Sequence, residues 1–327
     1  MTVLFGVFLL TLLVITAIAI VRATDLFVAV MLTGIFSLLT AVIFFLLDAA
    51  DVALTEAAIG AGISTVLFLG ALSLTGEQEQ SPSNNKLIAL LVVAITTIAI
   101  LYATFDKPRV GDPDAPVQTH VAPWYLEKTA EFIDIPNAVT AVLGSFRGYD
   151  TFGEVFVVLT AGIGVLFLLG KAPPPGAYRK QSLADDKGLR HYLIPRLVGR
   201  LVIPFIILFG FYVQFHGEYG PGGGFQAGAI IAAGIILFAL LEGEKRALEV
   251  IPHWFLRLLM AGGALIYGLV GVANLFLGGN FLDYSTLSNN PVNGEQLGII
   301  LIEAGVGITV TGVLLSIYYA FATRGKS

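Results

Sequence analysis

The chain has 327 residues, of which 56% are hydrophobic and 13% charged, and its formal net charge is −5. Soluble domains carry about 25% charged residues, so this composition indicates a membrane protein, and the modest net charge does not suggest a nucleic-acid partner. The absence of cysteine excludes disulfide scaffolds, thiolate metal sites and cysteine nucleophiles. The four histidines are scattered singly, so we expect no cofactor and no resident metal. They are His120, His191, His216 and His253.

Long apolar runs are the main feature along the chain. A helix that crosses a bilayer core of about 30 Å needs roughly 20 apolar residues. Nine runs approach this length, at 3–21, 26–47, 52–74, 87–105, 152–170, 193–215, 225–241, 254–277 and 297–322. The sequence therefore predicts an all-α, polytopic membrane protein with about nine transmembrane helices. No basic region precedes the first run, so we interpret it as a retained helix and not as a signal peptide.

Basic residues predict the orientation, because Lys and Arg are enriched in cytoplasmic loops. They cluster after the fifth run (Lys171, Arg179, Lys180, Lys187, Arg190), after the seventh (Lys245, Arg246) and at the C-terminus (Arg324, Lys326). Alternation then places the C-terminus in the cytoplasm and the N-terminus outside, together with segment 106–149. The expected location is a bacterial inner membrane, as a multi-pass protein.

Two polar stretches divide the chain into three parts. Segment 106–149 holds five prolines with Trp124 and Tyr125, which predicts an irregular external cap with one short interfacial helix near 125–132. Segment 171–190 contains three consecutive prolines and predicts a linker. We expect a membrane module over 1–105, a cap, one transmembrane helix and a cytoplasmic linker over 106–190, and a four-helix membrane module over 191–327.

Glu56 and Glu303 lie inside apolar runs, where a charge costs about 2.5–3.5 kcal/mol at the bilayer centre on insertion scales. Each is followed at four-residue spacing by small residues on its own helix face, so each should point at protein and away from lipid. These small residues are Gly60 and Ser64, and Gly307 and Thr311. Each acid is a candidate for ion translocation. The alternatives are a helix cap for Glu56, after Asp48 and Asp51, and a packing hydrogen bond for Glu303.

Asp150 and Glu154 lie four residues apart at the entry of the fifth helix, just after Arg147. Acids at a helix N-terminus are stabilised by the helix dipole, so a capping role and a role in ion translocation both remain open for Asp150. Glu154 lies deeper, where a proton relay or an ion pair is the favoured interpretation. Buried carboxylates suit a proton pathway because their raised pKa values let them load and unload near the working pH.

The glycine-rich stretch HGEYGPGGGFQAG at 216–228 links the sixth and seventh helices. It lacks the Gly-Lys-Ser/Thr ending of a phosphate loop. Gly222, Gly223 and Gly224 predict a structural turn, because glycine lets the backbone reverse without side-chain clash. The neighbouring His216 and Glu218 are titratable. With Asp48 and Asp51 they are candidates for an outer proton or cation entrance.

Several motifs give the chain a resemblance to a known family over nearly its whole length. DAADVALTEAAIGAG at 48–62 and FRGYDTFGE at 146–154 resemble the C-terminal region of the large A subunit of Mrp-type multisubunit Na⁺/H⁺ antiporters. From about residue 196, PGGGFQ at 221–226 and EAGVG at 303–307 resemble the B subunit. Related modules occur in membrane-bound hydrogenases. The chain departs from the family at Ala50, where proline is usual, and at Glu218, where histidine is common.

The resemblance implies that Glu56, Glu154 and Glu303 take part in ion translocation. It also implies partners: complex-I-like antiporter subunits, small Mrp subunits, the lipid bilayer, Na⁺ and H⁺. No Lys lies within the nine runs, so by comparison with the pumping subunits this chain is an accessory or sodium-path module. The leading interpretation is a non-enzymatic subunit of an antiporter that exchanges Na⁺ for H⁺, driven by the proton gradient. The alternatives are a membrane-arm subunit of a hydrogenase-like or complex-I-like redox-driven ion pump, and a structural scaffold.

Overall fold

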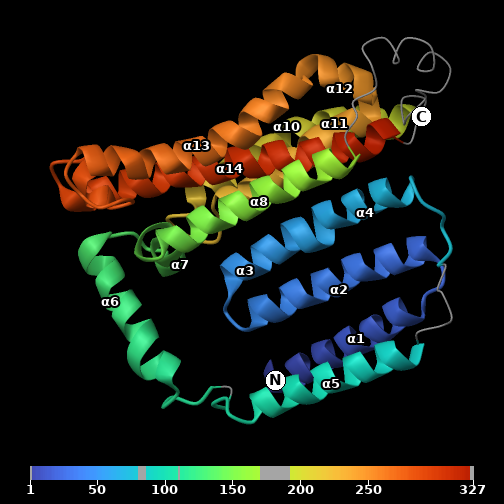
Figure 1. Ribbon diagram of the computed structural model, residues 1–327, viewed down its shortest axis with the longest axis horizontal. Coiled ribbons are helices and arrows are strands. Elements are labelled where there is room, and N and C mark those ends of the chain that lie inside the picture. The colour runs from blue at the N-terminus through green and yellow to red at the C-terminus, as the bar shows by residue number, and fades with distance from the viewer. Residues whose placement is uncertain (1, 80–85, 110, 170–191, 325–327) are drawn as a thin grey trace.

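A computed structural model describes residues 2–79, 86–109, 111–169 and 192–324 (Figure 1). Within these ranges nine helices are long and apolar enough to cross a membrane, and no strand is present, which confirms the predicted all-α polytopic class. The predicted linker at 171–190 with its basic residues, and His191, fall outside the described residues.

The N-terminal part contains the first three spans. They are α1 (Thr2–Arg22), α2 (Leu26–Leu46), and a third span made of α3 (Ala50–Thr55), η1 (Glu56–Ile63) and α4 (Ser64–Leu72). Asp25 caps α2, because its carboxylate accepts hydrogen bonds from the first backbone N–H groups of that helix. The third span is not the uniform helix that its hydropathy predicts. Its middle section η1 is a π-helix, a form that often marks functional sites.

The middle part holds two spans and the cap between them. The elements are α5 (Lys86–Thr104), η3 (Val117–Val121), α6 (Ala122–Phe132), α7 (Ala138–Ala141), η4 (Val142–Phe146) and α8 (Gly148–Leu169). The short helix expected in the cap is α6, which begins three residues before the predicted start. The short helices α7 and η4 were not predicted. Asn137 begins α7 by accepting a hydrogen bond from the N–H of Val139.

The C-terminal part supplies four spans. Its elements are α10 (Leu193–His216), α11 (Gly224–Glu242), α12 (Glu244–Val250), α13 (His253–Phe276), η6 (Tyr284–Leu287) and α14 (Pro291–Arg324). Helix α14 begins six residues before the predicted apolar run, at a proline, which is favoured in the first helical turn because it needs no N–H partner there. It packs against α8, α11 and α13 and is the central helix of this part (Figure 1).

Small residues let α14 approach its neighbours at backbone distance. A Cβ added to Gly263 of α13 would lie 2.4 Å from the carbonyl oxygen of Gly305, and one added to Gly228 of α11 would lie 2.7 Å from that of Gly307. No real side chain tolerates such contacts. Helices α11 and α13 therefore press on two faces of α14 through glycine, the usual packing device of membrane helices.

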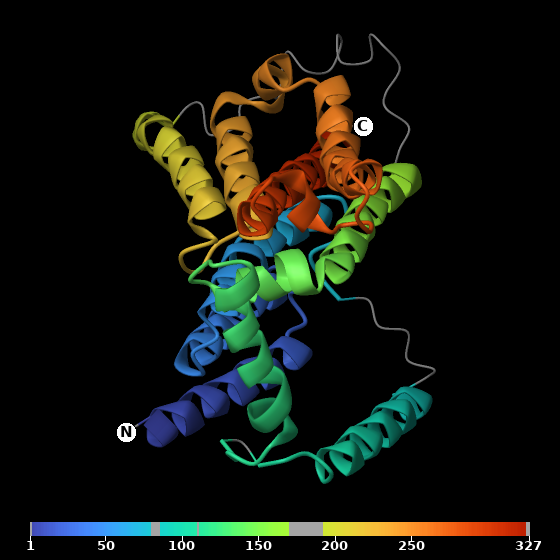
Figure 2. The same ribbon diagram turned by 90° about the vertical axis from the view of Figure 1, so that its left-hand side faces the viewer.

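The N-terminal helices are attached more loosely. Element η1 packs against α11 and α4 packs against α14, and Ile63 of η1 joins the core formed by α11 and α14. Helices α1 and α5 lie on the side of the molecule away from α13 and α14 (Figures 1 and 2). In these two spans 6% and 0% of the residues are buried within the chain. Their exposed apolar side chains need a lipid or protein covering.

Candidate functional site

The glycine turn between α10 and α11 is a tightly packed corner. Gly223 has a φ of +127°, which L side chains rarely adopt. A Cβ on Gly222 would lie 2.5 Å from the carbonyl oxygen of Val213, and one on Gly224 would lie 2.2 Å from that of Glu303. The three glycines therefore bring the start of α11 directly against the middle of α14.

Two residues from distant parts of the sequence hold this turn. The Asn137 side-chain amide donates to the carbonyl oxygens of Gly217 and Gly220, at 3.0 and 2.9 Å, and to the carboxylate of Asp51 at 3.2 Å. The same Asp51 oxygen accepts a bond from the N–H of Gly222 at 3.3 Å. One amide and one carboxylate thus tie the cap and the third span to the glycine turn.

Thr140 and Gln226 extend these links. The Thr140 hydroxyl donates to the carbonyl oxygen of Gly217 at 2.7 Å, and the Gln226 amide donates to the hydroxyl of Thr55 at 2.7 Å. No role for Asn137, Thr140 or Gln226 was predicted from the sequence. A signal was present, because asparagine directly after a proline and before an apolar segment is typical of a helix N-cap. Its long-range partners are visible only in the fold.

Glu303 sits in the middle of α14 and faces the glycine turn. A Cβ on Gly217 and one on Gly223 would each lie 3.3 Å from an oxygen of its carboxylate. The carboxylates of Glu218 and Asp51 also act electrostatically on Glu303. Acids from two other segments of the chain, the glycine turn and α3, therefore influence this carboxylate.

A cavity of about 370 Å³ opens beside Glu303, between α10, α11, α13 and α14. Its walls are apolar except for a few polar side chains, namely Gln214, Glu218, Glu303 and Thr311. Glu218 lies in the turn, and one of its carboxylate oxygens is buried without a hydrogen-bond partner in the described structure. Burial raises the pKa of Glu218 above its ordinary value, because a buried carboxylate loses its hydration.

Glu56 occupies a second polar position, at the start of the π-helical segment η1. One oxygen of its carboxylate lies 2.5 Å from the point that a Cβ on Gly60 would occupy, and the Ser37 hydroxyl of α2 lies 2.6 Å from the same point. Glycine at position 60 therefore leaves room for the acid to lie along its own helix, facing α2. Glu56 points at protein, as its small-residue stripe predicts.

Glu154 and Asp150 lie apart from the glycine turn. Glu154 is an exposed residue of α8. Asp150 is 58% exposed and pairs with Arg147 at 2.6 Å, an arrangement typical of a solvated helix start. The buried Tyr267 packs beside the start of α8, where its hydroxyl donates to the carbonyl oxygen of Gly148.

Three of the four residues considered for an outer entrance lie at the glycine turn. Asp51 and Glu218 are described above, and the carbonyl oxygen of His216 accepts hydrogen bonds from the N–H groups of Tyr219 and Gly220, while its ring stacks on Tyr212 with ring centroids 4.8 Å apart. Asp48 is separate, exposed at the α2–α3 connection with a φ of +59°. No group of three acidic or histidine side chains is close enough to hold a metal ion in the part of the chain that the structure describes.

Two family models match the chain. Residues 194–316 match a domain related to the MnhB subunit of Na⁺/H⁺ antiporters, and residues 11–77 match the MbhD family, the D subunit of MBH. A probable K⁺/H⁺ antiporter A/B subunit of Rhizobium meliloti is 27% identical over 90% of this chain and 32% of its own length. The putative antiporter subunit mnhB2 of Staphylococcus haemolyticus is 36% identical over 41% of this chain and 96% of its own length.

Two solved structures share the fold. The Mrp complex from Dietzia superposes with a TM-score of 0.73 and 25% identity, over 96% of this chain and 34% of that chain. The archaeal membrane-bound sulfane sulfur reductase has a TM-score of 0.53 and 30% identity, over 70% of this chain and 95% of that chain. The chain spans about a third of the Rhizobium protein and of the Dietzia chain. It therefore belongs to the Mrp-type multisubunit antiporter family, as a fusion of the C-terminal region of an A subunit with a B subunit.

Proposed function

We propose that this chain is a transporter subunit of a multisubunit monovalent cation/proton antiporter, which exchanges Na⁺ for H⁺ at the expense of the proton gradient. The observation that carries the proposal is Glu303, a mid-helix carboxylate that lines a cavity and faces the glycine turn. A carboxylate in this position can exchange a proton for a cation when water reaches the cavity. The relatives named as antiporter subunits support the same function.

The ion path that we propose runs through the junction of the three parts of the chain. Asp51 and Glu218 form its outer end at the glycine turn, and Glu303 is the group that loads and unloads. Glu56, which faces α2, provides a second carboxylate along the proposed ion path. Glu154 is exposed on α8 and makes no contact with the glycine turn that the structure shows, so we propose that it works together with a partner subunit.

The orientation proposed from the basic residues is N-terminus outside and C-terminus cytoplasmic, in a bacterial inner membrane. Among the described residues Arg196, Arg200, Lys245 and Arg246 lie at one end of the C-terminal helices, which supports the assignment of that end to the cytoplasm. Among the described spans, Lys86 at the first residue of α5 is the only lysine. Other membrane lysines would come from the remaining subunits of the complex, related to those of complex I.

Substitution of Glu303 by Gln tests the proposal most directly. In everted vesicles that contain the whole complex, a fluorescent pH indicator reports proton movement after Na⁺ or K⁺ is added. We expect Glu303→Gln to reduce exchange to near background while the complex still assembles, because glutamine keeps the shape and cannot release a proton. Glu295→Gln is the matched control on the same helix, since Glu295 accepts a hydrogen bond from Ser145 that glutamine can also accept. Wild-type exchange by Glu303→Gln would support the scaffold alternative.

A redox-driven ion pump is the second candidate, and the likeness to the sulfane sulfur reductase chain favours it. The membrane arm of such a complex would look similar, because the fold alone does not fix what drives the ions. The two candidates differ in their energy source. If ion movement in the vesicles requires an electron donor, and if iron–sulfur proteins purify with the chain, the redox candidate replaces the antiporter.

A further inference from the structure

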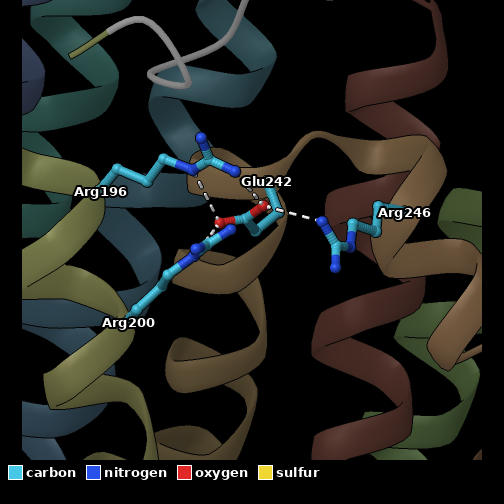
Figure 3. A network of polar contacts seen from close by, with 4 residues as sticks. All are labelled: Arg196, Arg200, Glu242 and Arg246. Atoms are coloured by element: carbon cyan, nitrogen blue, oxygen red, sulfur yellow. Dashed lines mark hydrogen bonds and ion pairs between the residues drawn. The ribbon is translucent and has the colours of Figure 1, made fainter. Parts of the chain in front are cut away.

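Figure 3 shows a network of four charged residues. It lies at the opposite end of α10 and α11 from the glycine turn, because α10 ends and α11 begins at that turn. Glu242, the last residue of α11, is 1% exposed and accepts hydrogen bonds from three arginines. Arg196 binds both of its carboxylate oxygens, at 3.1 and 3.2 Å, Arg200 binds one of them, and Arg246 reaches the carboxylate from α12 at 3.3 Å. The buried acid fixes the guanidinium groups in place.

The network carries more positive charge than its own acid neutralises. Three arginines meet one carboxylate, which leaves a formal charge of about +2 on these four residues, and the adjacent Glu244 and Lys245 cancel each other. The arginine side chains remain 30%, 47% and 53% exposed. Each guanidinium has five N–H donors, and the hydrogen bonds to Glu242 use at most two of them. Donors therefore remain on the outer surface for an anion.

The residues around the network are of the kind found at the depth of the lipid headgroups. Arg196 and Arg200 are one turn apart in the first two turns of α10, next to the exposed apolar residues Leu197 and Leu201. Trp254, near the start of α13 at the same end, is 61% exposed. Exposed tryptophan is typical of the membrane–water interface, which indicates that this end of the bundle lies where lipid phosphates are found.

We propose that Arg196, Arg200 and Arg246 bind the phosphate of an anionic phospholipid at this end of the bundle. Arginine suits this ligand because its planar donors match phosphate oxygens in a bidentate arrangement. The contacts with Glu242 hold the side chains in place before the lipid arrives, which lowers the entropic cost of binding. Nothing in the proposed ion exchange uses these four residues, so the two proposals stand or fall separately.

Native mass spectrometry of the purified complex tests the proposal. The probes are dioctanoyl phosphatidylglycerol, the zwitterionic dioctanoyl phosphatidylcholine, and inorganic phosphate as a competitor. We expect preferential binding of phosphatidylglycerol that inorganic phosphate at equal concentration does not displace. Each arginine near the surface contributes a factor of about five to binding, so we expect the double variant Arg200→Gln/Arg246→Gln to bind roughly 25-fold more weakly. Arg196 still pairs with Glu242 in this variant.

The matched control is Arg147→Gln, which removes a 60% exposed arginine just before α8, at the other end of the bundle, and should leave binding unchanged. Unchanged binding by the double variant overturns the proposal. So does equal binding of the two lipids, or displacement by inorganic phosphate. Loss of a partner subunit from the double variant, without any preference of the wild type for phosphatidylglycerol, assigns the arginines to a protein interface instead. If the double variant does not fold, Arg246→Gln alone decides the question, with about fivefold weaker binding expected.

Discussion

Two groups of helices differ in how much of their apolar surface is buried within the chain. The first group is α11, α13 and α14, and the second is α1, α2 and α5. The second group has the higher mean hydropathy, yet 6%, 11% and 0% of its residues are buried within the chain, against 56%, 39% and 61% in the first group. In a bilayer, lipid tails are as apolar as leucine, so hydropathy does not drive helices together. Glycine and polar contacts decide which helices pack, and those features are concentrated in the C-terminal part.

Replacing one glycine in the C-terminal bundle should have the largest effect, because it removes the close packing that distinguishes these helices. We expect Gly263→Ala to reduce the free energy of unfolding by about 1–3 kcal/mol, because its methyl group would overlap the carbonyl of Gly305. The adjacent Gly262→Ala is the matched control, since nothing lies within 4 Å of its Cβ position. Thermal unfolding of the two variants in detergent compares them directly. Equal midpoints would show that α13 and α14 do not pack through this glycine.

Asn137→Ala should loosen the contact between the third span and the glycine turn while leaving the helices on both sides folded. It removes three hydrogen bonds at the glycine turn and leaves the carbonyl oxygens of Gly217 and Gly220 without this donor, at a cost of about 1–3 kcal/mol. The contact between Asp51 and the turn should loosen. Hydrogen exchange of the third span and the turn measures this, and α13 is the internal control. Unaltered protection of both segments would contradict the linking role of Asn137.

Glu218 should give the smallest effect, one that depends on pH. Its pKa is raised by burial, so between its ordinary value of 4.5 and its folded value the native state binds more protons than the unfolded state. The stability that this group contributes is therefore present at low pH and lost as the pH rises through that window. We expect Glu218→Gln to remove this loss, so that the variant gains stability relative to wild type as the pH rises above about 4.5. Denaturant unfolding at several pH values measures the difference, and parallel curves would show that Glu218 is well hydrated.

The predicted segments and the observed helices agree closely, for a simple physical reason. A membrane core forces every backbone polar group to pair within its own helix, so the length of an apolar run predicts a span with little help from the rest of the fold. The small residues after Glu56 and Glu303 likewise predict that both acids point at protein. Local chemistry sufficed for these features.

The tertiary structure alone brought Asp51, Asn137, Glu218 and Glu303 together, since these residues come from four separate segments of the chain. The same is true of the three arginines around Glu242. Such contacts depend on how whole helices pack, and the packing follows from glycines whose neighbours lie more than 40 residues away, as Gly263 and Gly305 do. The sequence by itself determined which segments enter the membrane. The close approach of particular helices decided which acids lie together and which lie apart. Hydropathy does not show which helices approach closely, because all of them are apolar.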